Sequence, residues 1–425
     1  MASLTAHYNF LSGTRAITNP RVFRHRAPRQ SHIFCKRGCM FSEELHSARE
    51  RIAALGREHS VSLPSFRPKI AADLIPVLWH EEFGTGGALD SSILARSEAT
   101  KSRIYGGRIF PIVPIYVSSI CLENCVYCNY RAGNKGVGVE RRRLTDEELA
   151  LEAQFLIEEK GLRALELVYA ADPKMPADVM CRHVELLRRL LDRHGGGLVA
   201  ISAEALEEAD YRRLVAAGLS MSVLWQETYD DARYPVLHPG NTKKANFVYR
   251  LDAYDRMLLA CVPLVGIGVL SGLADWRQDW AMLMMHEEYL RSTYGQGATI
   301  FGVPRLKPAP GALLQESPFT PTREEYLAVV ALHNLFAPTT AAFVSTREEW
   351  DVCVELARGG GCLFTLNCST TPGGYALQHT GCQFTSHSYD APVYAEKLRE
   401  LGLDPMFLWS PADVAGGCRR MGAFR

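Results

Sequence analysis

Short apolar stretches alternate with longer amphipathic stretches between residues 111 and 366. The apolar stretches are β-rich and have the length of strands; they cover residues 111–117, 164–169, 198–202, 221–225, 264–270, 299–303, 342–345 and 363–366. Amphipathic stretches of helical length lie between most of them, for example residues 245–260, and those after Thr145 and Thr322 open with capping-box spacing. Because eight strands close a (β/α)8 barrel, the alternation predicts this TIM-type α/β barrel, with a doubly wound open sheet as the alternative.

The region before the first predicted strand differs in character. Residues 42–105 contain helical stretches and no chemical motif, which predicts an N-terminal helical extension. Residues 1–41 contain no Asp or Glu but six Arg and several Ser and Thr, a composition typical of a transit peptide; a disordered basic arm, or a true start at Met40, is the alternative. We therefore divide the chain into a basic leader (1–41), a helical extension (42–105), a barrel (106–375) and a C-terminal segment (376–425).

Composition and charge exclude several classes of protein. Lys+Arg and Asp+Glu number 47 each, so no global charge favours nucleic acid as a partner. No apolar run reaches the roughly 18 residues of a membrane span. Twelve cysteines without a secretory signal indicate a reducing, intracellular compartment. We expect an organelle matrix (mitochondrion, hydrogenosome or plastid) if the leader is a transit peptide, and the cytoplasm otherwise.

Three cysteines follow the first predicted strand with the spacing C-x3-C-x2-C: Cys121, Cys125 and Cys128. Structural zinc sites and ferredoxin-type clusters take four protein ligands, and no fourth Cys or His lies nearby in the sequence. Three ligands on a [4Fe–4S] cluster leave one iron open to a substrate or cofactor; a zinc half-site is the alternative. A barrel would place this loop at its C-terminal face, where active sites lie.

This loop resembles the signature of the radical S-adenosylmethionine (SAM) superfamily. The resemblance implies that the open iron of a [4Fe–4S] cluster chelates SAM, whose one-electron cleavage yields a 5′-deoxyadenosyl radical. It implies that Tyr127, just before the third cysteine, packs near the adenine. Members of the superfamily also carry a Gly-Glu element that holds the SAM amino group. Ala170 and Ala171 replace it here, which leaves Asp172 as the candidate substitute.

Residues 105–410 resemble in particular the aromatic amino acid lyases, which include 2-iminoacetate synthase (ThiH) and the [FeFe]-hydrogenase maturase HydG. The matching segments occur in one order, at residues 121–135, 141–148, 226–229, 238–239, 265–273, 303–308, 345–348 and 369–375. The resemblance implies cleavage of the tyrosine Cα–Cβ bond to p-cresol and 2-iminoacetate (dehydroglycine). It assigns the substrate carboxylate to Arg305. Gln226 and Glu227 follow the fourth predicted strand, at the mouth of a barrel, and are placed to hold the SAM ribose or the substrate amine; a capping pair for the next turn is the alternative. Arg347, after the seventh strand, is equally well placed, although a helix start also explains it.

The same resemblance leaves several alternative functions open. The second-cluster cysteines of the maturase have no counterpart among the late cysteines, so we expect the lyase activity without formation of CO and cyanide. Tryptophan or another amino acid is the alternative substrate, and a HydG-like maturation protein or a non-catalytic iron–sulfur protein is the alternative function. The expected partners are a reductant such as ferredoxin or flavodoxin, and a thiazole synthase or a hydrogenase maturation partner that receives the product.

Overall fold

A computed structural model describes residues 40–57 and 71–414, so residues 1–39 of the predicted leader lie outside the described part. Its centre is a closed parallel barrel, in which β1 pairs with both β2 and β8. The strands are β1 (Arg108–Tyr116), β2 (Ala164–Val168), β3 (Leu198–Ser202), β4 (Met221–Val223), β5 (Leu264–Gly268), β6 (Ile300–Gly302), β7 (Ala341–Val344) and β8 (Gly361–Thr365). The predicted (β/α)8 barrel is confirmed, and the open sheet is excluded.

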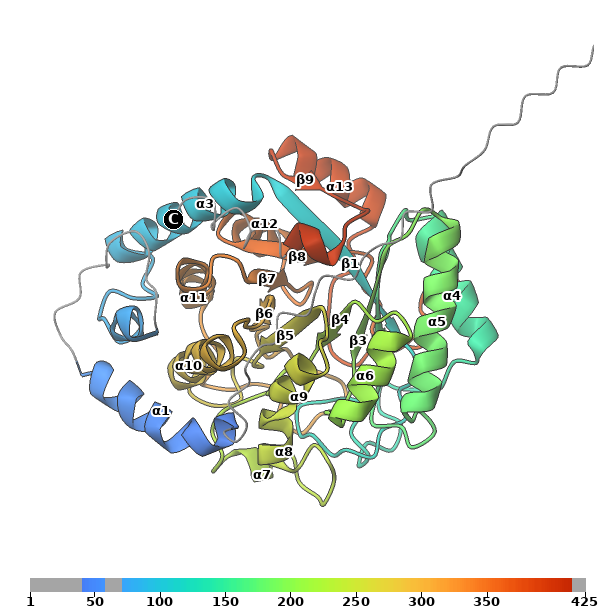
Figure 1. The fold of residues 1–425 in the computed structure, drawn as a ribbon, viewed down its shortest axis with the longest axis horizontal. Helices are drawn as coiled ribbons and strands as arrows, with labels where there is room; N and C mark the ends of the chain where they lie inside the picture. The colour runs from blue at the N-terminus through green and yellow to red at the C-terminus, as the bar shows by residue number, and fades with distance from the viewer. Residues whose placement is uncertain (1–39, 58–70, 415–425) are drawn as a thin grey trace, which may run out of the picture. The chain divides into compact units, whose positions relative to one another are not determined.

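Helices cover the outside of the strands (Figure 1). They are α4 (Asp146–Glu158), α5 (Ala177–Arg193), α6 (Glu208–Ala216), α7 (Tyr234–Leu237), α8 (Phe247–Leu251), α9 (Ala253–Leu259), α10 (Trp276–Tyr294), α11 (Arg323–Phe336) and α12 (Trp350–Arg358). The two predicted capping boxes are present: Glu148 and Glu325 each donate a backbone N–H, over 3.2 Å, to the hydroxyl of Thr145 and Thr322 respectively. Each box satisfies orphan backbone donors at the start of its helix.

The amphipathic stretch 245–260 is not one helix, as its pattern predicts, but two short ones. The chain leaves helical geometry at Asp252, between α8 and α9. The Asp252 carboxylate accepts hydrogen bonds from the Ser42 backbone N–H (3.2 Å) and hydroxyl (3.0 Å). Ser42 belongs to α1 (Phe41–Leu55), so a contact between distant parts of the chain accompanies the break.

The N-terminal extension packs against one group of barrel helices. It comprises α1, a 3-10 turn (Ala71–Asp73), α2 (Ile75–Leu78) and α3 (Ala88–Tyr105). Helix α1 contacts α10, where the Phe41 ring stacks on His286 at 3.9 Å, and α3 contacts α11. No helix within residues 40–57 or 71–414 is both long enough and apolar enough to cross a membrane.

The C-terminal segment returns to the N-terminal end of the barrel. Helix α13 (Ala391–Glu400) leads into β9 (Asp404–Pro405), which pairs with the start of β1. The buried Trp409 indole then donates a hydrogen bond to the Pro111 carbonyl over 2.9 Å. Trp409 joins an apolar cluster that includes Phe110, Ile112 and Leu363. Side chains therefore fill this end of the barrel.

Candidate functional site

A cavity of about 220 Å³ lies among the carboxyl ends of the barrel strands. Its lining combines residues of β1, β2, β3, β7 and β8 with the loops that follow the strands. Glycines make room for the largest side chain of its wall: a Cβ at Gly268 or Gly302 would lie 2.5 or 2.4 Å from the Trp225 ring. A cavity at this face is where a (β/α)8 barrel carries its chemistry.

Cys121, Cys125 and Cys128 line one side of this cavity with free thiols. The loop is tied to two neighbouring loops, because Leu122 donates its N–H to the Ala171 carbonyl and Val126 to the Leu237 carbonyl, each over 3.0 Å. The loop that follows the first strand therefore presents all three sulfurs to one space.

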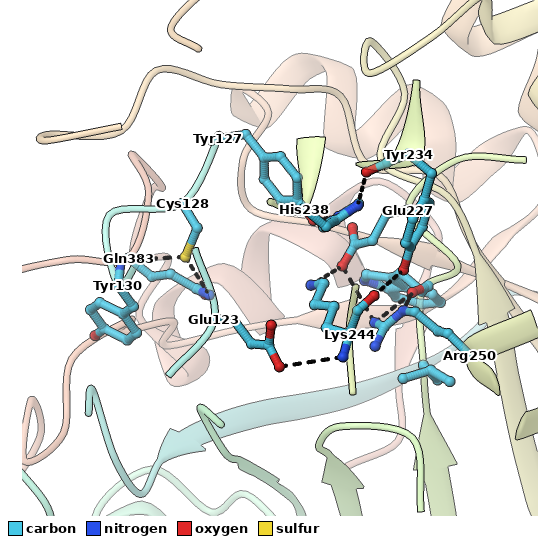
Figure 2. A network of polar contacts seen from close by, with 12 residues as sticks. Glu123, Tyr127, Cys128, Tyr130, Glu227, Tyr234, His238, Lys244, Arg250 and Gln383 are labelled. Carbon is cyan, nitrogen blue, oxygen red and sulfur yellow. Dashed lines mark hydrogen bonds and ion pairs between the residues drawn. The ribbon is translucent and has the colours of Figure 1, made fainter. Parts of the chain in front are cut away.

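Figure 2 shows how the third sulfur is held. The Cys128 Sγ accepts contacts from the Tyr130 backbone N–H (3.3 Å) and the Gln383 side-chain amide (3.5 Å). Such N–H···S contacts are a means of tuning an iron–sulfur cluster.

The charge state of the thiols depends on what binds them. Burial, and the nearby Cys128 and Cys125, raise the pKa of Cys121 to about 12, and burial raises the pKa of Cys125 to about 11. Thiolates here require a strong positive charge, which cluster iron supplies. Within the described part of the chain, no three His, Cys, Asp or Glu side chains are arranged around a single ion. The donor set fits a multi-iron cluster, in which each cysteine binds a different iron.

Tyr127 also lines the cavity, and its orientation is fixed by hydrogen bonds. Its hydroxyl lies 2.8 Å from His238 Nε2, and His238 Nδ1 lies 3.0 Å from the Tyr234 carbonyl (Figure 2). Burial and the charge of Lys244 lower the His238 pKa to about 3, so the imidazole is neutral. A neutral ring that donates from Nδ1 accepts at Nε2, which leaves Tyr127 as the donor.

Glu227 is an ionised carboxylate at the cavity wall, just after β4. It lies 2.7 Å from Lys244 Nζ and 3.4 Å from an Arg250 nitrogen (Figure 2). Burial alone would raise its pKa, but Lys244 and Arg250 outweigh burial and lower it to about 2. Its φ of 76° lies in the left-handed region that non-glycine residues avoid, a type of strain that clusters at functional sites.

The structure does not place Gln226 or Asp172 in the cavity wall. Trp225 and Glu227 face the cavity, and Gln226 between them faces away; its amide is buried with no hydrogen-bond partner among the described residues. The Asp172 carboxylate is held by Arg143 (2.5 and 2.7 Å) and by the Ser118 hydroxyl (2.6 Å). Burial acts to raise the Asp172 pKa, but these hydrogen bonds outweigh it and lower the pKa. The SAM-binding roles of both residues stay predictions.

Arg305 and Arg347 have contrasting surroundings. Arg305 does not line the cavity and forms a two-pronged ion pair with the buried Glu348, which also lies 3.1 Å from Lys307. Arg347 does line the cavity, stacks on the Phe384 ring (3.4 Å to its centroid), and donates no side-chain hydrogen bond to any described residue. An unpaired guanidinium in a cavity is suited to a ligand carboxylate. The sequence signal for Arg347 was its place three residues past a strand.

The ion pair predicts a structural effect for Arg305. We expect Arg305→Gln to lower the free energy of unfolding by about 3 kcal/mol, because it leaves Glu348 buried with only Lys307 to balance its charge. Denaturant unfolding of the two proteins would measure this. Arg323→Gln is the matched control, since its partners Asp351 and Glu355 are exposed, and we expect little change. Equal stability of Arg305→Gln and the parent protein would contradict the prediction.

Glu166, which the sequence analysis did not single out, also lines the cavity. The feature of the sequence that marks Glu166 is its charge within an otherwise apolar strand. Burial raises its pKa from 4.5 to about 7. The folded state therefore binds this proton more tightly than the unfolded state does, so Glu166 lowers stability progressively as pH rises from about 4.5 to about 7.

We expect Glu166→Gln to remove this penalty. The variant should exceed the parent protein in unfolding free energy by up to about 3 kcal/mol at pH 8, and should match it near pH 4.5. Urea unfolding of the ligand-free proteins at several pH values measures the difference. A gap that is independent of pH would contradict the prediction.

Comparison with known proteins agrees with this geometry. No family model matches the chain. It is 30% identical over 328 residues to the 2-iminoacetate synthase of Escherichia coli (strain K12), which covers 76% of this chain and 83% of the relative. A crystal structure of HydG, a maturase of the [FeFe]-hydrogenase, is 28% identical with a TM-score of 0.74 and covers 90% of this chain and 83% of that one. HydG from Carboxydothermus hydrogenoformans is 26% identical with a TM-score of 0.73, over 88% and 82% of the two chains.

A closed (β/α)8 barrel with three thiols on the loop after its first strand defines the radical SAM class of enzymes. Within that class, the chain belongs to the family that contains 2-iminoacetate synthase and HydG. Membership of this family implies a [4Fe–4S] cluster and SAM as cofactors.

Proposed function

We propose that the protein is a radical SAM lyase that cleaves the Cα–Cβ bond of tyrosine to p-cresol and 2-iminoacetate. One observation carries the proposal: the three thiols of the loop line the same cavity as Arg347, whose guanidinium has no hydrogen-bond or ion-pair partner within residues 40–57 and 71–414. The proposed cleavage of an amino acid needs a radical source near the substrate amine and a cation near the substrate carboxylate. A cluster held by the three cysteines would supply the electron for cleavage of SAM, and so the radical that a lyase of this kind needs at the substrate amine.

In this proposal the chain's own residues bind and orient the two small molecules. Cys121, Cys125 and Cys128 hold the cluster, and Tyr127 presents its ring to the adenine. The Arg347 guanidinium binds the substrate carboxylate through two parallel hydrogen bonds. Arg305 remains a second candidate for that role, but Glu348 would first have to release it.

Glu227 accepts hydrogen bonds from the SAM ribose or the substrate ammonium, because Lys244 and Arg250 keep it ionised at any pH of interest. Its fixed charge also means that it takes up no proton during turnover. We assign it to binding rather than to acid–base chemistry, which requires a pKa near the working pH.

One anaerobic assay tests the proposal. The protein is reconstituted with iron and sulfide and given SAM, dithionite and tyrosine; 5′-deoxyadenosine, p-cresol and glyoxylate, the hydrolysis product of 2-iminoacetate, are then measured. We expect all three to form together. Formation of 5′-deoxyadenosine without p-cresol would rule out tyrosine as substrate and favour tryptophan. Formation of neither with an intact cluster would favour the non-catalytic iron–sulfur protein.

The partners follow from the same proposal. Ferredoxin or flavodoxin would replace dithionite as the electron donor. A thiazole synthase or a hydrogenase maturation enzyme would receive 2-iminoacetate, which hydrolyses readily in water.

A further inference from the structure

Glu166 lies deeper in the barrel than the groups assigned above. It is the third residue of β2 and pairs in register with Pro114 of β1 and Ala200 of β3. Arg347 comes three residues after the end of β7, and the cysteine loop comes after the end of β1. The Glu166 carboxyl therefore stands below both of them, towards the filled end of the barrel.

This carboxyl has no partner in the described chain. The other carboxylates of the cavity wall have partners in the described chain: Glu227 lies against Lys244, Glu123 accepts from the Thr242 hydroxyl and the Lys244 backbone N–H, and Glu204 shares a hydrogen bond with Glu123. Within residues 40–57 and 71–414, Glu166 receives no hydrogen bond and no ion pair, although only 7% of its surface is exposed. A buried carboxyl left in this state destabilises a protein unless a ligand supplies the missing donor.

Two hydroxyls of the cavity wall do not fill that role, because their hydrogens are used elsewhere. The Tyr116 hydroxyl donates to the Gln383 side-chain oxygen over 2.8 Å, and the Thr365 hydroxyl donates to the Val344 carbonyl over 3.3 Å. Both residues line the same cavity as Glu166. Neither of these hydroxyls is free for Glu166, which leaves its carboxyl open to water in the cavity or to a ligand that displaces this water.

The cavity that Glu166 lines has aromatic side chains in its wall. Trp225 and Phe343 line the cavity with ring centroids 5.9 Å apart, and Tyr116 lines it from β1. Flat aromatic side chains pack well against such surfaces. A ligand whose carboxylate lies at Arg347 and whose amine lies towards the cysteine loop would extend its side chain against these rings.

We propose that Glu166 accepts a hydrogen bond from the far end of the substrate side chain, and so selects aromatic amino acids whose ring carries an O–H or N–H donor. This inference rests on the proposed function and adds the feature that defines the substrate class. Tyrosine and tryptophan satisfy it, and phenylalanine does not. A buried acceptor rejects the analogue that lacks the donor, because the acceptor would then stay unpaired.

The test compares pairs of ligands that differ only in the donor: tyrosine with phenylalanine, and tryptophan with 1-methyltryptophan. Binding to the reconstituted protein with SAM, without reductant, is measured by calorimetry, and turnover is measured separately. We expect the donor-bearing member of at least one pair to bind about 100-fold or more tightly than its analogue. Glu166→Leu should reduce that ratio to roughly threefold or less, whereas Glu166→Gln, whose amide oxygen still accepts, should keep most of it.

Iron content and thermal unfolding of both variants check that they fold and load the cluster. Equal binding within both pairs, no binding of any of the four amino acids, or an unchanged ratio in a folded Glu166→Leu would each overturn the inference. If only the proposed function were wrong, the donor preference and its dependence on Glu166 would persist, while no p-cresol would form. The ligand class and the reaction are therefore judged by separate measurements.

Discussion

Cys125→Ala is expected to abolish formation of 5′-deoxyadenosine. Cys125 is one of the three cysteines of the loop after β1 that line the cavity, and with two of them left the cluster loses an anchor that no other residue of this loop replaces. We expect turnover to fall by about 10³-fold or more, and the iron content and brown absorption to fall with it, because the cluster is the source of the radical. Anaerobic reconstitution followed by iron analysis and quantification of 5′-deoxyadenosine measures both.

Cys181→Ala is the matched control, because Cys181 lies on α5 and does not line the cavity. We expect it to retain iron and activity. A Cys125→Ala protein that still releases 5′-deoxyadenosine at the parental rate would show that the cluster is bound elsewhere. The same loss in both variants would point to general damage rather than to a ligand.

Arg347→Gln is expected to separate cleavage of SAM from turnover of the amino acid. The variant keeps the three cysteines but removes the unpaired guanidinium of the cavity wall. Losing a buried, charge-assisted pair with the substrate carboxylate should cost about 3 kcal/mol, or roughly 100-fold in kcat/KM for tyrosine. Slow release of 5′-deoxyadenosine without p-cresol should persist. Steady-state kinetics with both products quantified tests this expectation.

Arg305→Gln is the informative comparison for that experiment. If Arg347 binds the carboxylate, Arg305→Gln loses stability through the unbalanced Glu348 but keeps its KM for tyrosine. The reverse pattern, a raised KM in Arg305→Gln and an unchanged KM in Arg347→Gln, would return the role to Arg305 as the family resemblance implies. Both variants are compared at a temperature where each is folded.

Local sequence signals were sufficient for much of the architecture. Strand and helix periods are set by each segment's own side chains, so the eight strands emerged from the hydrophobic pattern, and so did the capped starts of α4 and α11. The break at Asp252 could not emerge in this way, because it coincides with a contact to Ser42, 210 residues away. The local pattern of hydrophobic and polar residues therefore does not predict a helix break that accompanies a contact between distant segments.

By itself, the sequence determined the cluster loop, since Cys121, Cys125 and Cys128 lie within eight residues and any fold keeps them together. Only the tertiary structure decided which polar residues at the strand ends belong to the site. The backbone after β4, which enters the left-handed region at Glu227, turns Glu227 towards the cavity and Gln226 away from it, and partners far away in the chain decide which charges remain free for a ligand. Facing direction and pairing are properties of the assembled barrel, because they depend on strand register and on residues that meet only after folding.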